Sequence, residues 1–186
     1  IISLTTDFGR EDAFVGVMKG IILHLNPKVR IVDLCHEIPA GQIMEASFVV
    51  GSAYKYFPAG TIHVVVVDPG VGSERRPIMA KTDRYFFIAP DNGALSCIYQ
   101  DYPGAQVFHL TQRQYFRSEI SHTFHGRDIF APVAAWLSMG LAPQVFGPEI
   151  DDYLKLEIPQ PHQMAPNAFE FQVLHIDHFG NLITTI

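Results

Sequence analysis

Apolar and polar positions along the first part of the chain switch between strand and helix spacing. Residues 1–4 form an apolar run that leads into the polar residues 5–12. Apolar side chains then recur at helical spacing over 14–25. Asn26-Pro27 should end that helix, because proline disfavours helical geometry in the residue before it. The pattern predicts a strand, a polar loop and a helix.

The alternation continues through the middle of the chain. Residues 31–34 predict a second strand, and a helix is expected over about 42–56. Residues 62–67 form an unbroken run rich in β-branched side chains, which is typical of a parallel strand buried on both faces. Further strands are expected over 85–88 and 107–110.

One more helix is expected from near Asp128, whose carboxylate suits the positive end of the helix dipole, to Gly140. Strands that alternate with helices in this way predict an α/β layered fold over residues 1–165, with a largely parallel sheet flanked by helices. A proline-punctuated linker and the first strands of another unit are expected over 166–186. A piece of that length cannot bury its own core, so either the sequence is truncated or this piece docks on the main domain.

Composition narrows the class of protein. The chain has 186 residues, 48% of them hydrophobic, which suits a compact domain with a sizeable core. Its net charge of −6 and its lack of a Lys/Arg cluster argue against a nucleic-acid partner and favour a cationic small molecule. No apolar run is long enough for a membrane span and no basic segment opens the chain, so we expect a cytoplasmic protein without membrane contact. Cys35 and Cys97 are expected to be buried thiols.

Four polar loops follow predicted strands, at 5–12, 68–75, 90–93 and 122–128. Ligands of open α/β sheets bind outside the carboxyl ends of strands, so these loops should share one rim. Taken singly, the charged residues of these loops have ordinary structural interpretations, as a turn cap, a solvated loop residue or a helix-entry residue. Together, a carboxylate, a guanidinium and an imidazole can orient and deprotonate one water molecule.

Two other sites are weaker hypotheses. His122 and His125 form an HxxH pair, but zinc normally takes three protein ligands, and neither an HExxH motif nor a cysteine pair is present. We therefore expect no metal. Gly70-Val71-Gly72 resembles the start of a dinucleotide-binding loop, but Arg75 stands where its third glycine belongs.

As a set, the motifs of this chain resemble the S-adenosyl-L-methionine (SAM) hydrolase family, also called SAM hydroxide adenosyltransferases, of the fluorinase-like superfamily. The match covers essentially the whole chain in the expected order. The motifs are Thr6-Asp7-Phe8-Gly9 with Asp12, Met18-Lys19-Gly20, Asp33-Leu34-Cys35-His36-Glu37-Ile38, Phe57-Pro58-Ala59-Gly60-Thr61, Val67-Asp68-Pro69-Gly70-Val71-Gly72, Ala89-Pro90-Asp91-Asn92-Gly93, Phe124-His125-Gly126-Arg127-Asp128 and Asp177-His178-Phe179-Gly180-Asn181.

The resemblance implies an α/β domain followed by a small β-barrel domain, in a homotrimer whose active sites lie between neighbouring subunits. It implies hydrolysis of SAM to adenosine and L-methionine without a cofactor. The residues that match the family's water-activating triad are Asp68, Arg75 and His125. Asp7 matches the carboxylate that binds the ribose diol. The residues that match positions around the methionine and adenine groups are Asp12, Asp177 and Asn181.

Three rival functions remain open. Relatives that use fluoride or chloride in place of water carry an uncharged residue at the position of Asp68, and its carboxylate would repel a halide. A SAM-binding protein without turnover and a metal-dependent hydrolase are the other two.

Overall fold

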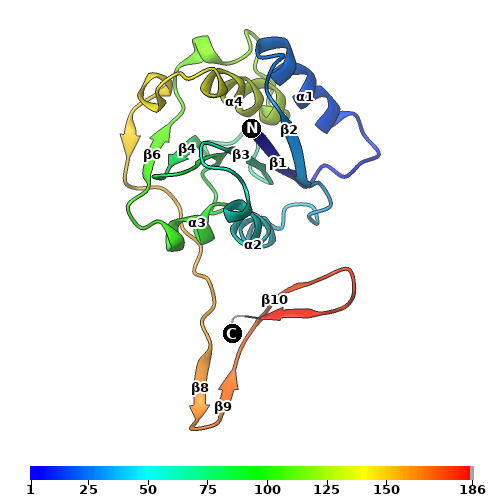
Figure 1. Cartoon of the computed structure of the whole chain (residues 1–186), viewed down its shortest axis with the longest axis vertical. Coiled ribbons are helices and arrows are strands. Elements are labelled where there is room, and N and C mark those ends of the chain that lie inside the picture. The colour runs from blue at the N-terminus through cyan, green and yellow to red at the C-terminus, as the bar shows by residue number, and fades with distance from the viewer. Residues whose placement is uncertain (185–186) are drawn as a thin grey trace.

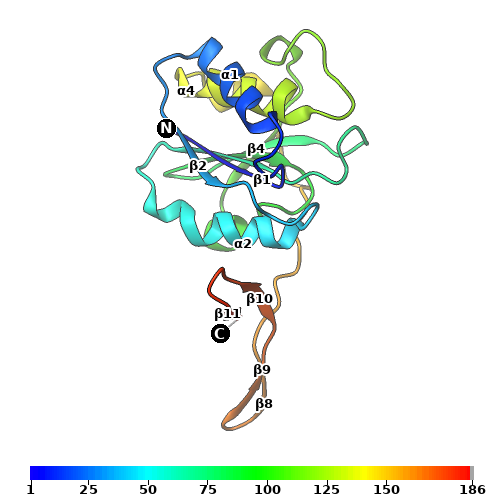
Figure 2. The ribbon, with the colours of Figure 1, turned by 90° about the vertical axis from the view of Figure 1, so that its right-hand side faces the viewer.

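The computed structural model describes residues 1–184 and places a seven-stranded sheet between two layers of helices (Figures 1 and 2). The strand order across the sheet is β2-β1-β3-β5-β4-β6-β7. The strands are β1 (Ile2–Thr6), β2 (Ile31–Cys35), β3 (Ile62–Val66), β4 (Pro77–Lys81), β5 (Phe86–Pro90), β6 (Gln106–His109) and β7 (Glu149–Ile150).

One half of the sheet consists of parallel pairs and the other half consists of antiparallel pairs. Strand β1 pairs in parallel with β2 and β3, and β3 pairs in parallel with β5. Strand β4 runs antiparallel to both β5 and β6, and β6 is antiparallel to β7. The carboxyl ends of β1, β3, β5 and β6 therefore meet at one rim, as the sequence predicted.

Helices cover both faces of the sheet (Figure 2). On one face α1 (Phe14–Leu25) packs against α4 (Ala131–Ser138), and on the other α2 (Ile43–Ala53) packs against α3 (Ser96–Asp101). Helix α1 ends at the predicted residue, where the backbone N–H of Asn26 donates to the carbonyl of Ile22. The predicted α/β fold is confirmed.

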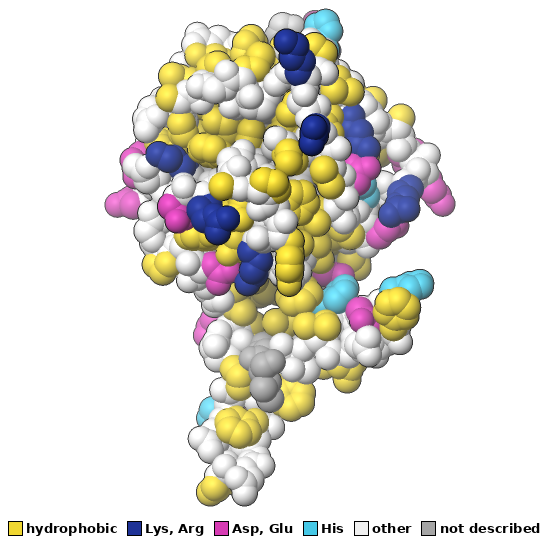
Figure 3. All heavy atoms as spheres, in the orientation of Figure 1, with side chains coloured by type: hydrophobic (Ala, Val, Ile, Leu, Met, Phe, Trp, Pro, Cys, Tyr) yellow, Lys and Arg dark blue, Asp and Glu magenta, His cyan; other side chains and the backbone are white. Residues whose placement is uncertain are grey.

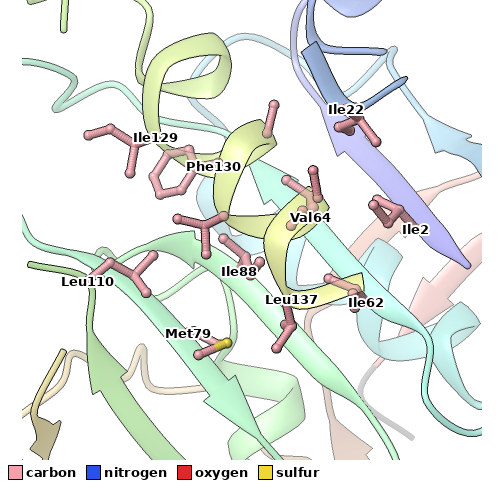
Figure 4. Close-up of a cluster of buried hydrophobic side chains, with 14 of the residues drawn as sticks. Ile2, Ile22, Ile62, Val64, Met79, Ile88, Leu110, Ile129, Phe130 and Leu137 are labelled. Carbon is pink, nitrogen blue, oxygen red and sulfur yellow. The ribbon is translucent and has the colours of Figure 1, made fainter. Parts of the chain in front are cut away.

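Burial on both faces explains why strand β3 is rich in apolar residues. Val64 and Val66 belong to the core cluster under α1 and α4, which Figure 4 shows with Phe130 and Ile88. Val65, between them in the chain, faces the second core cluster under α2 and α3. Side chains alternate across a strand, so a strand between two helical layers is buried at every position and is largely apolar.

The segment after β7 is fixed to the main domain before the chain leaves it. The backbone N–H of Leu154 donates to Asp91 Oδ1 (2.8 Å), and that of Leu156 donates to Ser96 Oγ (2.7 Å). Gly93 has a φ of +94°, and a Cβ on it would lie 2.4 Å from Leu156 Cγ. The Leu156 side chain therefore closes directly over the glycine backbone.

Two hairpins follow, formed by β8 (His162–Ala165) with β9 (Ala168–Glu170) and by β10 (Val173–Ile176) with β11 (Leu182–Thr184). Strands β9, β10 and β11 lie within 166–186, where the first strands of another unit were predicted, whereas β8 precedes that range. His175 of β10 contacts α2, bonding to Glu45 (3.1 Å) and stacking on Phe48 (5.5 Å between ring centroids). The second hairpin thus docks on the main domain. The boundary at residue 165 stays a prediction, and the last two residues of the predicted second unit, 185–186, lie outside the described residues.

The two cysteines are more exposed than the sequence predicted. Cys35 and Cys97 are free thiols but only half-buried, because Cys35 ends the edge strand β2 and Cys97 lies in the first turn of the surface helix α3.

Within residues 1–184 no helix is long and apolar enough to cross a membrane. On the face seen in Figure 3, Lys and Arg side chains are scattered among Asp and Glu.

Burial of His63 should make the protein acid-sensitive. His63 is fully buried on β3 and bonds to Ser3 Oγ (2.6 Å), and burial lowers its pKa to about 4. Between pH 6.5 and 4 the unfolded chain therefore takes up a proton that the folded chain does not. We expect the free energy of unfolding to fall by about 3 kcal/mol over this interval. Urea unfolding at pH 7 and pH 4.5 measures it; a His63→Phe variant should lose this part of the pH dependence, and a variant at the exposed His24 should keep it.

Candidate active site

Asp68 and Arg75 form a bidentate ion pair at the rim beyond β3. Arg75 Nε donates to Asp68 Oδ1 (2.9 Å), and Arg75 Nη2 donates to Asp68 Oδ2. Both side chains are more than nine-tenths buried, at 8% and 5% exposure. A guanidinium fork that matches both carboxylate oxygens holds the two groups in one orientation.

His125 joins this pair through the same guanidinium. Arg75 Nη2 also donates to His125 Nδ1 (2.7 Å). Since arginine can only donate, His125 accepts at Nδ1, and its neutral ring carries the proton on Nε2. Burial, followed by the positive charge of Arg75, lowers the pKa of His125, so the neutral ring is favoured near pH 7. The three residues that the sequence placed together do lie together.

Arg75 has further hydrogen-bonding capacity within the site. Its Nη1 is buried and forms no hydrogen bond with any residue in the described range 1–184. Its guanidinium carbon lies 5.4 Å from the ring centroid of Phe130, which supports the group from one side. Buried donors in proteins are almost always paired, so Nη1 is suited to an oxygen acceptor from a bound molecule.

The loop from Asp68 to Arg75 folds tightly enough to bring its two ends together. Val71 N donates to Asp68 O (3.2 Å), and Ser73 N donates to Gly70 O (3.1 Å). Gly72 has a φ of +78°, and a Cβ there would lie 2.3 Å from the backbone oxygen of His122. Only glycine fits this contact between the loop that carries Arg75 and the loop that carries His125.

Asp128 anchors the helix entry that carries His125, where the turn Gly126–Phe130 is a π-helix that leads into α4. Its fully buried carboxylate accepts from Arg127 Nε (2.6 Å) and Nη2 (2.9 Å), from Ser121 N (2.9 Å) and from Arg117 Nη1 (3.4 Å). Burial alone would raise the pKa of Asp128, but these hydrogen bonds, with Arg127 foremost, lower it. The carboxylate therefore binds guanidinium groups, where the sequence suggested only a helix dipole.

Asp7 follows β1 on the same rim and is half-buried. Its Oδ2 accepts from Gly41 N (2.9 Å). Sequence reasoning did not single out His36, which fixes this loop from the neighbouring strand end. His36 Nδ1 bonds to Thr6 Oγ1 (2.9 Å), and its backbone oxygen accepts from Gly9 N (2.8 Å). The only signal for it in the sequence is its place in the quoted motif.

The remaining predicted residues are not gathered with this cluster. Asp12 is exposed at the end of the loop that carries Asp7. Asp177 and Asn181 lie in the β10–β11 turn and bond to each other (2.7 Å), and this bond lowers the pKa of Asp177. Within residues 1–184, neither of them forms a hydrogen bond or ion pair with Asp68, Arg75 or His125.

His122, which forms the HxxH pair with His125, is exposed. Among the described residues no group of three or more His, Cys, Asp or Glu side chains is arranged to hold a metal ion.

Comparison with known families tests the resemblance directly. The family model described as the SAM hydroxide adenosyltransferase N-terminal domain matches residues 2–147. The chain belongs to the SAM hydroxide adenosyltransferase family. The match spans the layered domain from β1 to the segment before β7, and so includes every residue of the Asp68–Arg75–His125 cluster.

Individual relatives agree with the family model. A protein of Salinispora tropica named (R)-S-adenosyl-L-methionine hydrolase is 39% identical over 184 residues, which cover 97% of this chain and 70% of that protein. A solved structure of an uncharacterized conserved protein from Thermotoga maritima has a TM-score of 0.94 at 39% identity, covering 100% of this chain and 71% of that one. A protein of Nocardia brasiliensis named fluorinase is more distant, at 25% identity over all of this chain and 71% of its own length.

Proposed function

We propose that this protein hydrolyses S-adenosyl-L-methionine to adenosine and L-methionine. The observation that carries the proposal is the buried array in which Arg75 bonds to both Asp68 and His125. The relatives named as SAM hydrolases support the substrate, since they are 36% to 39% identical to this chain.

The array suits displacement at a sulfonium by water. The water oxygen forms a bond to C5′, the C5′–S bond breaks, and its electron pair stays on sulfur as a neutral thioether. The leaving group needs no acid, so the protein has only to hold water in line and accept its proton. An Asp68 oxygen lone pair outside the Arg75 fork accepts a hydrogen bond from the water and then takes its proton, which leaves to solvent, while Arg75 holds the carboxylate in place.

Asp68 also separates hydrolysis from halide transfer. A carboxylate and a halide 4 Å apart repel by about 4 kcal/mol at an effective dielectric near 20. Arg75 offsets part of this repulsion, but the guanidinium is already committed to Asp68 through two of its nitrogens. Water, which can donate to the carboxylate, is the better nucleophile for this site.

The assembly and the other contacts to substrate extend the proposal. Asp7 binds the ribose diol through the oxygen that Gly41 leaves free, and Asp12 lies toward the methionine group. Asp177 and Asn181, in an exposed turn away from the cluster, complete the adenine side of a neighbouring subunit's site in a homotrimer. Exposed apolar side chains on α1, among them Phe14, Val17 and Leu23, supply surface for such an assembly. The protein works in the cytoplasm and needs no cofactor.

Incubation with SAM, with and without chloride, tests the function. We expect adenosine and methionine in both cases, identified by chromatography. The (R) and (S) sulfonium epimers should be supplied separately, because the relatives' name specifies (R). Formation of 5′-chloro-5′-deoxyadenosine would indicate a halogenase, binding without product would indicate a SAM-binding protein, and loss of activity with a chelator would indicate a metal enzyme.

Asp7→Ala should weaken substrate binding more than it slows the chemical step. Hydrogen bonds to a charged group contribute about 1.5 to 3 kcal/mol, so we expect KM to rise roughly ten- to hundredfold while kcat changes little. Steady-state kinetics give both values. Glu11→Gln removes an exposed carboxylate from the same loop and should leave KM unchanged. An unaltered KM with a collapsed kcat in Asp7→Ala would contradict the diol-binding role.

A further inference from the structure

A pocket of about 550 Å³ opens beside His125 and next to the Asp68–Arg75 loop, of which Gly72 and Ser73 line it. It lies beyond the ends of β4 and β6, and neither Asp7 nor Asp68 lines it. Its titratable lining residues are all basic: His109, Arg113, Arg117, His122 and His125. Since His125 lines this pocket and also bonds to Arg75, one side chain connects the pocket to the catalytic array.

The basic character of this lining contrasts with the negative net charge of the whole chain. The protein has 19 Asp and Glu residues against 13 Lys and Arg, yet no carboxylate lines the pocket. Glu74 and Glu119 adjoin lining residues in the sequence but do not line it. The buried carboxylate of Asp128 is bonded to Arg127 and to the lining residue Arg117.

The other lining groups narrow the ligand. Hydroxyl groups of Ser73, Thr111, Ser118 and Ser121 add neutral donors, and Leu110, Ile120 and Ile129 add an apolar wall. The Arg113 guanidinium has no hydrogen bond or ion pair with any residue in the range 1–184. Arginine forks and hydroxyl donors together recognise a phosphate group, whereas an apolar wall suits an organic body.

We infer that this pocket binds the phosphate group of a small phosphomonoester and that its occupation slows hydrolysis. A bound dianion favours the protonated form of His125. A protonated ring cannot accept from Arg75 Nη2 at Nδ1, so the bond that joins His125 to the Asp68–Arg75 pair is lost. The inhibitory effect rests on the proposed function, whereas the binding itself does not.

Calorimetry without SAM tests the binding, with inorganic phosphate and glucose 6-phosphate as separate probes at constant ionic strength. We expect both to bind and the ester to bind more tightly. Arg113→Gln should weaken binding about tenfold, as expected for the loss of one charged donor to a phosphate. The matched control is Arg30→Gln, which removes an exposed arginine from the loop before β2, at the opposite end of the sheet, and should bind as the unaltered protein does. No heat with either probe, or equal binding by Arg113→Gln, would overturn the site.

Turnover of SAM tests the coupling. Phosphate should lower kcat without raising KM for SAM, sodium chloride at equal ionic strength should not, and Arg113→Gln should be resistant while keeping full turnover in the absence of phosphate. Binding in calorimetry without any effect on kcat would overturn the inhibition and leave the site. Absence of turnover in the unaltered protein would contradict the proposed function without touching the binding result.

Discussion

Asp68→Asn should lower turnover by roughly a hundredfold or more, the effect expected for loss of a general base. The amide keeps the size of the carboxylate but cannot take the proton of water. It also presents an NH₂ group to a guanidinium that can only donate, so one arm of the fork with Arg75 is lost. Single-turnover kinetics with saturating SAM measure the chemical step directly.

Two other outcomes of this substitution are informative. Retained hydrolysis with a new 5′-chloro product would show that Asp68 acts mainly through its charge, by holding Arg75 and excluding halide. Unchanged hydrolysis without that product would show that Asp68 only caps the turn, and the catalytic assignment would be withdrawn. Asp83→Asn removes the same charge from an exposed turn at the far end of β4 and should leave turnover unaltered.

Gly72→Ala should damage both stability and turnover. An L-residue at a φ of +78° costs about 1 to 2 kcal/mol, and the new Cβ would lie 2.3 Å from the His122 backbone oxygen. Since backbone is in the way, one of the two loops must move. We expect a loss of more than about 2 kcal/mol in urea unfolding. Turnover should fall as well, because Arg75 and His125 stand on the two loops that separate.

Gly60→Ala is the matched control for the backbone conformation. Gly60 has a similar φ of +82°, but no atom lies within 4 Å of its Cβ position. It should therefore show the conformational cost alone and keep normal turnover. Equal losses in the two variants would mean that the contact with His122 contributes nothing.

The sequence predicted the layered fold because its longer elements carry strong periodicity. Apolar spacing located α1, and the buried β-branched run located β3. Strand β4 was missed since it begins with proline and directly follows the loop that carries Arg75. Helix α3, with six residues, is too short to show a helical period. Strand β4 is also what makes half of the sheet antiparallel.

For the site, loop position predicted more than residue type did. The rim rule brought Asp68, Arg75 and His125 to one edge, and the structure adds the fork and the tautomer of the histidine. The anchoring role of His36 depends on a bond to Thr6, 30 positions away, and that of Asp128 depends on how its own loop folds around it, and periodicity can reveal neither. The pocket beside His125 was also missed: its basic residues all lie at the end of β6 or in the connection between β6 and α4, but they have no periodicity that would show that this connection surrounds a pocket.

The contact between Leu156 and Gly93 limits how far the following hairpins can lie from the main domain. Five residues, 157–161, separate this anchor from β8, and an extended chain spans about 3.4 Å per residue. The first residue of β8, His162, must therefore lie within about 20 Å of Leu156. A short linker therefore keeps the hairpins near Leu156. Exchange of the hairpins between two copies of the chain would require the Leu156 residues of the two copies to lie close together.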